Sequence, residues 1–283
     1  MSDVPEELRQ KLCLALDVDD LVAANRLARD LKGHFGVVKV GLELFTAVGP
    51  DVIGAMNDYG YRVFVDLKLH DIPNTVERAS RVLGALGASY LTMHAHGGAP
   101  MLRAGVTGLM EGAANAGLPE PVAVAVTVLT SDADAPDHII PQRVRVAAEG
   151  GCQAIVCAVG DLPDVRTLTP RMIKVVPGIR PEGAPADDQA RVGTPQEALD
   201  AGADLLVIGR PITRADDPVQ AAADLVAAVT TVGEGDAHAA AAQRRAAPGR
   251  TGEGRRGPPG PGRAEGRAPG GHRQPRGRVH PRR

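Results

Sequence analysis

Residues 62–75 read RVFVDLKLHDIPNT, an apolar strand pattern interrupted by charged residues. The side chains of a β-strand alternate between its two faces, so the valines and leucines at odd positions from 63 to 69 share one face. Asp66 and Lys68 share the other face, and Asp71 follows at the end of the strand. Buried charges are costly unless they are paired, and even a pair rarely stabilises more than apolar residues of the same size. The stretch therefore indicates a functional site, with a solvent-facing ion pair on an edge strand as the alternative.

The same order of strand and helix repeats through residues 1–232. Apolar runs predict eight strands, at residues 12–18, 37–44, 62–70, 90–96, 121–130, 154–160, 173–179 and 204–209. Helical patterns follow them, at about residues 20–32, 50–59, 75–86, 100–116, 141–150, 162–168, 195–201 and 218–231. Thr194 and Glu197 have the spacing of a capping box at the start of one of these helices.

Eight alternating units in one domain predict an α/β fold, the closed (β/α)8 TIM barrel, over residues 1–232. An open doubly wound sheet is the alternative. Such a sheet usually has a glycine-rich turn after its first strand, whereas residues 17–20 read DVDD and contain no glycine.

Residues 233–283 differ in composition from the rest of the chain. They carry 12 arginines and 4 acidic residues, a net charge of +8, whereas residues 1–232 carry 20 basic and 30 acidic residues, a net charge of −10. The segment is rich in Gly, Pro and Ala and has one β-branched aliphatic residue, Val279, so it cannot bury enough surface to offset its ordering entropy. We expect a disordered tail without a role of its own. An Arg-rich nucleic-acid-binding arm is the alternative, but no aromatic side chains interleave with the arginines.

The remaining composition predicts a cytoplasmic protein that does not contact membranes. The three cysteines, Cys13, Cys152 and Cys157, form no ligand-like cluster, and the first two stand among apolar neighbours as buried thiols of a reducing compartment do. The N-terminal sequence MSDVPEELRQK lacks an apolar signal core, and no apolar run reaches the length that spans a membrane.

Six of the predicted strands carry polar residues, or a Gly-Arg pair, in the strand or just after it, and a TIM barrel holds its active site at the C-terminal ends of its strands. These residues are Asp17, Lys39, Asp66, Lys68, Asp71, Thr130, Arg180, Gly209 and Arg210. This repeated pattern predicts a site for a polar, charged substrate. Because barrels often bind phosphate with the loops after strands 7 and 8, Arg180 and the Gly209-Arg210 pair predict a phosphate group on that substrate. A plain turn is the alternative for the Gly-Arg pair taken alone.

Residues 66–75, DLKLHDIPNT, resemble the active-site signature of the orotidine 5′-monophosphate decarboxylase family. Other blocks with the order and spacing of that family span residues 16–17, 39–41, 126–131, 176–180, 188–189 and 207–211. The similarity extends from about Leu12 to Val232 and does not include the tail. It implies a TIM barrel that converts orotidine 5′-monophosphate to UMP and CO2, in de novo pyrimidine biosynthesis, without a metal or other cofactor.

The resemblance also implies roles for the candidate residues. Lys68, which the carboxylates of Asp66 and Asp71 keep protonated, would stabilise the carbanion left at C6 of the pyrimidine and protonate it. Asp66 would lie near the departing carboxylate. Asp71 and Thr75 would reach into the site of a neighbouring subunit, so a homodimer with shared active sites is implied. The expected substrate contacts are Asp17 and Lys39 with the ribose, Thr130 with the pyrimidine, and Gln189, Gly209 and Arg210 with the phosphate, with Arg180 at the root of a loop that closes over it.

Other assignments remain open at this point. A magnesium-dependent keto-sugar phosphate decarboxylase or aldolase would share the Asp-x-Lys-x-x-Asp core, but such relatives place a metal-binding carboxylate where this chain has Lys39, and they lack the continuation of residues 72–75. A non-enzymatic barrel carrying a nucleic-acid-binding tail would not need the charged pattern. His94 and His96, two apart on one strand, are interpreted as hydrogen-bonded structural residues, with a metal site as the alternative.

Overall fold

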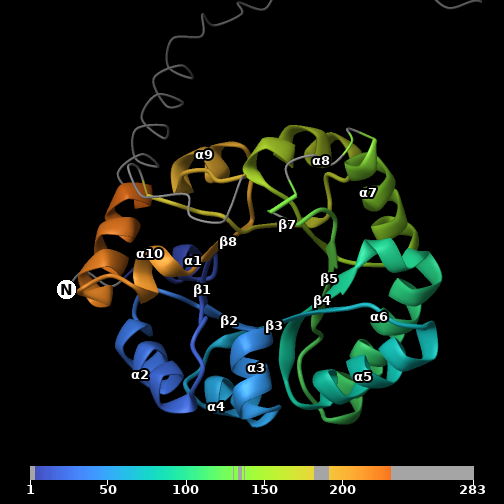
Figure 1. Ribbon diagram of the computed structural model, residues 1–283, viewed down its shortest axis with the longest axis horizontal. Coiled ribbons are helices and arrows are strands. Elements are labelled where there is room, and N and C mark those ends of the chain that lie inside the picture. Colours follow the sequence, from blue (N-terminus) through green and yellow to red (C-terminus); the bar gives the residue numbers. More distant parts are fainter. Residues whose placement is uncertain (1–3, 130, 133–135, 137, 182–190, 231–283) are drawn as a thin grey trace, which may run out of the picture. The chain divides into compact units, whose positions relative to one another are not determined.

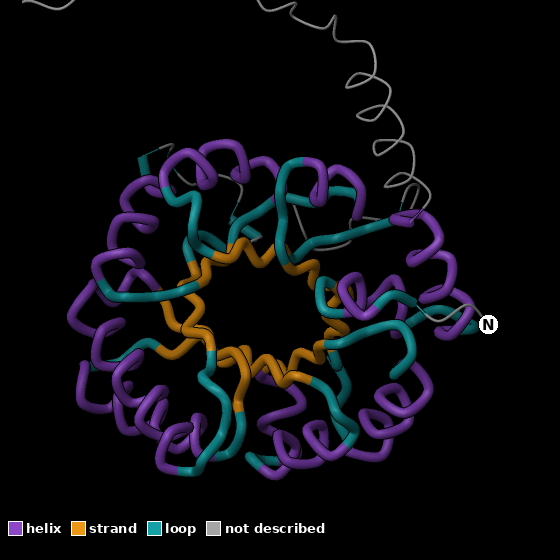
Figure 2. Tube along the Cα trace, turned by 180° about the vertical axis from the view of Figure 1, so that it is seen from behind, coloured by secondary structure: helices purple, strands orange, loops and turns teal. Residues whose placement is uncertain are grey.

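The computed structural model describes residues 4–129, 131–132, 136, 138–181 and 191–230. Eight parallel strands in this part of the chain close into a barrel in sequence order (Figures 1 and 2). They are β1 (Leu12–Ala15), β2 (Val37–Gly41), β3 (Arg62–Leu69), β4 (Ala88–His94), β5 (Val122–Val126), β6 (Ala154–Val156), β7 (Ile173–Val176) and β8 (Leu205–Ile208). β1 completes the ring by pairing with β8, where Cys13 lies opposite Val207. The predicted TIM barrel is confirmed, and the open sheet is excluded.

Helices form an outer ring around the strands, as Figure 2 shows. They are α1 (Glu6–Arg9), α2 (Leu21–Leu31), α3 (Leu42–Val48), α4 (Asp51–Asp58), α5 (Pro73–Ala85), α6 (Gly98–Asn115), α7 (Ile139–Glu149), α8 (Leu162–Leu168), α9 (Pro195–Asp200), α10 (Arg210–Thr213) and a last helix over residues 218–230. Two short 3₁₀ helices, η1 (Ala95–Gly97) and η2 (Val159–Asp161), follow β4 and β6. None of the described helices is long and apolar enough to cross a bilayer.

The start of α9 has the predicted capping box. The backbone N–H of Glu197 donates to Thr194 Oγ1 (3.2 Å), and the backbone N–H of Thr194 donates to Glu197 Oε2 (2.8 Å). Two N–H groups that lack partners within the helix are thereby satisfied. This helix precedes β8.

Most predicted strands extend past the observed ones; β1, expected to residue 18, ends at Ala15, and β5, expected to residue 130, ends at Val126. At two strands a helical turn takes over the end of the apolar run. The expected strand 37–44 ends at Gly41, because the chain turns there into α3, and the expected strand 154–160 contributes only Ala154–Val156. In both places apolar residues continue past the strand into a helical turn that packs on the barrel. An apolar run alone does not distinguish a buried strand from a buried helix, so these boundaries were wrong.

The inside of the barrel is filled by side chains from alternate strand positions. They are Cys13, Ala15, Val37, Phe64, Tyr90, Val124, Ala154, Val175, Leu205 and Val207. The Phe64 and Tyr90 rings pack with their centroids 5.6 Å apart. A larger apolar layer fills the space between the strands and the helices. All three cysteines are buried and free, which confirms the prediction of buried thiols for Cys13 and Cys152 and adds Cys157.

β3 loses its regular geometry at the residues that the sequence singles out. Its pairing with β4 shifts register between Val65 and Leu69, which leaves three residues of β3 opposite Thr92 alone. Lys68 lies in this bulge with φ of 51°, the one positive φ among the described non-glycine residues. The predicted alternation therefore ends at Val65, and Leu67 and Leu69 are half-buried rather than part of the core.

Candidate active site

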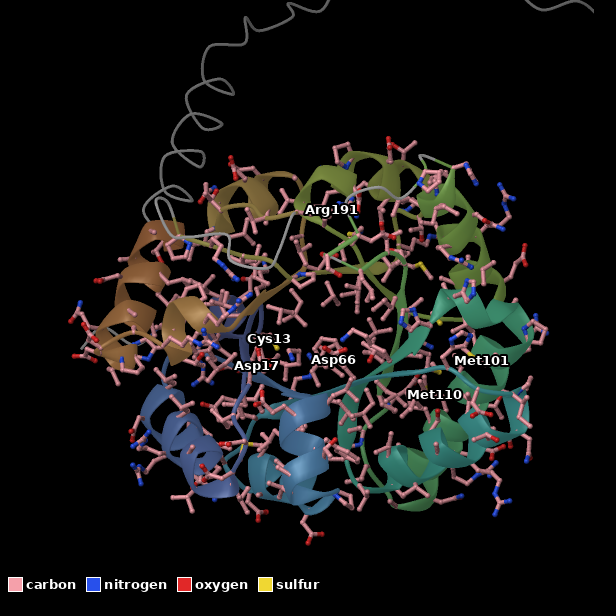
Figure 3. The ribbon with its side chains drawn as sticks, viewed as in Figure 1. Cys13, Asp17, Asp66, Met101, Met110 and Arg191 are labelled. Carbon is pink, nitrogen blue, oxygen red and sulfur yellow. The ribbon has the colours of Figure 1, made fainter. Side chains whose placement is uncertain are left out.

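Four charged side chains from the first three strands meet at the C-terminal end of the barrel. Lys39 Nζ lies 3.1 Å from Asp17 Oδ1 and 3.6 Å from Asp66 Oδ2. Lys68 Nζ lies 2.9 Å from each carboxylate oxygen of Asp66. Figure 3 shows Asp17 and Asp66 near the barrel axis, on the side formed by β1 to β3. We call these four residues the charge network, in which negative and positive groups alternate.

Within the charge network, Asp66 and Lys39 stay ionised despite burial. Burial opposes the ionisation of Asp66, but the ammonium groups of Lys39 and Lys68, together with hydrogen bonds from Lys68 and Thr92, outweigh it and hold the pKa of Asp66 below its ordinary value. Burial also favours the neutral form of Lys39, and the carboxylates of Asp66 and Asp17 outweigh it, so the pKa of Lys39 is raised. Both groups are therefore charged at neutral pH, although their side chains are largely buried.

Thr92 on β4 connects two members of the charge network and was not predicted from the sequence. Its Oγ1 accepts a hydrogen bond from the backbone N–H of Lys68 (2.9 Å), and its hydroxyl donates to Asp66 Oδ1 (3.0 Å). The residue is fully buried. An uncharged threonine in the run YLTMHAH has no chemical signal of its own, and only the register shift of β3 brings it to the site.

One cavity joins the charge network to the ends of the last two strands. It has a volume of ≈ 220 Å³. The charged or glycine residues that line it are Asp17, Lys39, Asp66, Lys68, Gly178, Arg180, Gly209 and Arg210. Apolar side chains of Val126, Val128 and Val156 line the wall between the two sides. Seven of the eleven sequence-predicted site residues are thus in one place, at the end of the barrel where chemistry was expected.

The side of this cavity formed by β7 and β8 presents arginines. Arg180 is 6% exposed, and its Nη1 donates to the Ile179 carbonyl (3.0 Å). Arg210 follows Gly209 at the end of β8. A Cβ atom added to Gly209 would lie 3.3 Å from Asp17 Oδ2, tighter than most contacts of this kind, so glycine lets the end of β8 approach the charge network. We call Arg180 and Arg210 the arginine side.

The backbone of Arg180 is held by a short neighbouring segment. Its N–H donates to the Gly193 carbonyl (2.9 Å), and the Gly193 N–H donates to the Gly178 carbonyl (3.2 Å). Two residues before Gly193, Arg191 forms an ion pair with Asp161 of η2. These contacts fix the position from which Arg180 reaches the cavity.

Asp71 and Thr75 do not line the cavity of their own chain. Both are exposed, and Asp71 Oδ1 accepts a hydrogen bond from the backbone N–H of Ile72 (2.7 Å). In the described part of the chain no ion pair joins Asp71 to Lys68, so of the two carboxylates expected beside Lys68 only Asp66 is there. Thr130 and Gln189, the other two predicted contacts, lie outside the described residues, as does the tail 233–283.

Three histidines cluster beside the site. The ring centroid of His70 lies 5.9 Å from that of His94 and 5.4 Å from that of His96, and Arg143 Nη2 lies 2.5 Å from His96 Nδ1. Burial, followed by the neighbouring cations and imidazoles, lowers the pKa of His94. Among the described residues, no three His, Cys, Asp or Glu side chains are arranged to hold a metal ion.

Known proteins match nearly all of the barrel. The sequence profile of the orotidine 5′-phosphate decarboxylase / HUMPS family matches residues 10–225. The orotidine 5′-phosphate decarboxylase of Moorella thermoacetica is 43% identical over 236 residues, which cover 79% of this chain and 94% of that protein. The enzyme of the same name from Thermobifida fusca is 45% identical over 236 residues, covering 78% and 97%.

A solved structure shows the same similarity. The crystal structure of orotidine 5′-phosphate decarboxylase from Lactobacillus acidophilus superposes with a TM-score of 0.66 at 33% identity, covering 76% of this chain and 97% of that one. The family profile over residues 10–225 includes the strands that carry the charge network and those that carry the arginine side. The chain belongs to the orotidine 5′-phosphate decarboxylase / HUMPS family.

Proposed function

We propose that this protein decarboxylates orotidine 5′-monophosphate to UMP and CO2 without a cofactor. The observation that carries the proposal is a single cavity with an alternating charge network on one side and two arginines on the other. The family profile adds support, because its match over residues 10–225 includes the residues that build both sides, and so do the decarboxylase names of relatives 43–45% identical to this chain.

In the proposed complex the substrate lies across the cavity, with its phosphate at the arginine side and its pyrimidine at the charge network. The phosphate lies against Arg180, Gly209 and Arg210, where guanidinium groups offer paired donors to a phosphate. The family resemblance would add Gln189, which lies outside the described residues. The ribose hydroxyls lie against Asp17 and Lys39. This leaves the C6 end of the pyrimidine beside Asp66 and Lys68; the family resemblance would assign the pyrimidine contact to Thr130, which lies outside the described residues.

Lys68 is the proposed catalytic residue. When the bond between C6 and the carboxyl carbon breaks, its electron pair stays on C6 and CO2 leaves. The Lys68 ammonium stabilises the developing negative charge and then transfers a proton to C6, which completes UMP; solvent returns a proton to the amine. Asp66 stays ionised and holds the Lys68 ammonium at a fixed position beside the departing carboxylate.

The active unit of the proposal is a homodimer with shared sites. Asp71 and Thr75 face outward from their own cavity, at the turn where Pro73 starts α5. Ile72 between them is 66% exposed, as an apolar residue at a contact with another subunit would be in an isolated chain. In the dimer Asp71 and Thr75 complete the neighbouring cavity.

The position of Lys39 argues against the magnesium-dependent alternative. Its ammonium lies between the carboxylates of Asp17 and Asp66, within 3.1 Å and 3.6 Å of them. A divalent cation bound by these carboxylates would have to displace it, since a protonated lysine cannot serve as a ligand.

The direct test is to follow the loss of orotidine 5′-monophosphate absorbance with the purified full chain in the presence of EDTA. We expect full activity under these conditions and UMP as the product by chromatography. Activity that disappears on chelation and returns with magnesium would overturn the proposal and favour the keto-sugar phosphate alternative.

A further inference from the structure

The bulge of β3 leaves a backbone group without a partner in the strand ladder. Val65 pairs with Leu91 and Leu69 pairs with Met93, so the backbone N–H of Lys68 has no strand partner on β4. The Thr92 hydroxyl takes the place of that partner at 2.9 Å. A buried N–H without a hydrogen bond would be costly, and this one is satisfied by a side chain rather than by a backbone carbonyl.

Lys68 also has a backbone conformation that lysine rarely adopts. Its φ of 51° lies in the left-handed region, where the Cβ atom is crowded by the backbone. Such a conformation persists only where neighbouring groups enforce it, and it is found mainly at functional sites. The hydrogen bond from the Lys68 N–H to Thr92 is one contact that enforces it.

The Thr92 hydroxyl also contacts Asp66, the ion-pair partner of Lys68. It donates to Asp66 Oδ1 at 3.0 Å, and that oxygen also accepts from Lys68 Nζ at 2.9 Å. Thr92 Oγ1 is thus hydrogen-bonded both to the backbone of Lys68 and to the side chain of Asp66. A fully buried strand position between Leu91 and Met93 would otherwise suit valine, since a buried hydroxyl is costly unless both its donor and its acceptor are used.

We propose that Thr92 is a positioning residue, whose hydroxyl holds the Lys68 backbone and the Asp66 carboxylate in the relative placement that proton delivery requires. The inference rests on the proposed function, in which Lys68 is the proton donor. Thr92 itself lines no part of the cavity and touches no substrate. Its effect reaches the reaction through the orientation of the lysine side chain.

The test uses two variants of this residue and one matched control. Thr92→Val keeps the shape and removes the hydroxyl, whereas Thr92→Ser keeps the hydroxyl. Thr127→Val is the control, because Thr127 is a buried threonine at the end of β5 whose hydroxyl donates to the Val156 carbonyl (2.7 Å) and not to the charge network. For each protein kcat and KM for orotidine 5′-monophosphate, the Kd of UMP, and the urea midpoint of unfolding are measured.

We expect Thr92→Val to lower kcat about 10- to 100-fold, the size of a lost hydrogen bond to a charged group or a small misplacement at a reacting centre. The Kd of UMP should change less than about threefold, because the arginine side is untouched. Thr92→Ser should stay within about threefold of wild-type kcat. A Thr92→Val enzyme with wild-type kcat, or a Thr92→Ser enzyme as slow as Thr92→Val, would overturn the proposal, and so would an equal loss of kcat in Thr127→Val.

A second measurement does not depend on decarboxylation. Titration of the Asp66 carboxyl carbon by NMR should give a higher pKa in Thr92→Val than in the wild type, and a wild-type pKa in Thr92→Ser, because the hydroxyl stabilises the carboxylate form. An unchanged Asp66 titration in Thr92→Val would overturn the inference. If the wild-type protein fails to turn over orotidine 5′-monophosphate, the proposed function falls while this titration still decides whether Thr92 positions Asp66.

Discussion

The charge network and the arginine side face each other across one cavity but carry charge differently. In the charge network each ammonium contacts a carboxylate of the same chain, and Lys39 contacts two. On the arginine side both charged residues that line the cavity are cations. The ion pairs of the charge network hold its side chains against one another, and the two guanidinium groups that line the opposite side of the cavity favour an anion there. We infer that the reacting groups are preorganised on one side and that binding energy comes mainly from the other.

The largest expected effect comes from removing the proton donor. Lys68→Ala should lower kcat by about 10²- to 10⁴-fold or more, because general acid catalysis and charge stabilisation at C6 are lost together. The Kd of UMP, measured by calorimetry, should change little, since the arginine side remains. Lys32→Ala, an exposed lysine at the end of α2, is the control. A Lys68→Ala enzyme within about tenfold of wild-type kcat, about 1.4 kcal/mol of barrier, would exclude Lys68 as the donor.

Mixing two inactive variants tests whether the charge network is completed by a second chain. Lys68→Ala and Asp71→Ala, mixed in equal amounts and allowed to exchange subunits, should form about half heterodimers, each with one intact site. About a quarter of wild-type activity should then return, if the sites act independently. Mass spectrometry of the mixture verifies exchange. A mixture that stays inactive after verified exchange would place Asp71 in the site of its own chain.

Removing a cation from the arginine side should change binding more than chemistry. Arg210→Met should raise KM and the Kd of UMP about 10- to 100-fold, the value of one or two charge-assisted hydrogen bonds to phosphate. Arg214→Met, an exposed arginine just after α10, should behave like the wild type. The comparison of kcat and of the Kd of UMP between Arg210→Met and Lys68→Ala tests the inference. If Arg210→Met lowered kcat as much as Lys68→Ala and left the Kd of UMP unchanged, Arg210 would not act mainly in binding.

Acid should weaken the charge network. The folded state holds the pKa of Asp66 below its ordinary value, so this carboxylate contributes stability above its unfolded pKa and loses that contribution as the pH falls through the folded pKa. The free energy of unfolding of the wild type should therefore exceed that of Asp66→Asn at neutral pH, with a gap that narrows below about pH 4. Urea unfolding of both proteins between pH 3 and pH 7 measures the gap. A gap independent of pH would mean that ionisation of Asp66 does not stabilise the fold.

Features that depend on neighbouring residues in sequence were predicted well. The spacing of Thr194 and Glu197 gave the capping box, and apolar runs gave the number and order of the strands. Asp66 and Lys68 were expected together and do form an ion pair. The expected reason was strand alternation, but the pair forms in a bulge where alternation has ended.

Features that depend on the register between strands could not be predicted. Thr92 reaches Asp66 and Lys68 only because three residues of β3 stand opposite one of β4, and no local pattern encodes that offset. Asp71 is three residues from Lys68 in sequence, yet it is exposed outside the cavity, since the chain has already turned toward α5. Where β3 ends, closeness in sequence to Lys68 therefore did not predict which side chains lie in the cavity.

The buried thiols give this molecule an internal reporter of its motions. Burial raises the pKa of Cys152 and Cys157 to about 12 and raises that of Cys13 as well, so almost no reactive thiolate exists in the folded state. A thiol reagent can then modify a cysteine only when the surrounding strands open. Cys13 lies on β1 beside the charge network, and Cys157 lies just after β6, on the other side of the ring. The rates at which the two are labelled would rank the local stability of the two halves of the barrel, without any substrate or engineered probe.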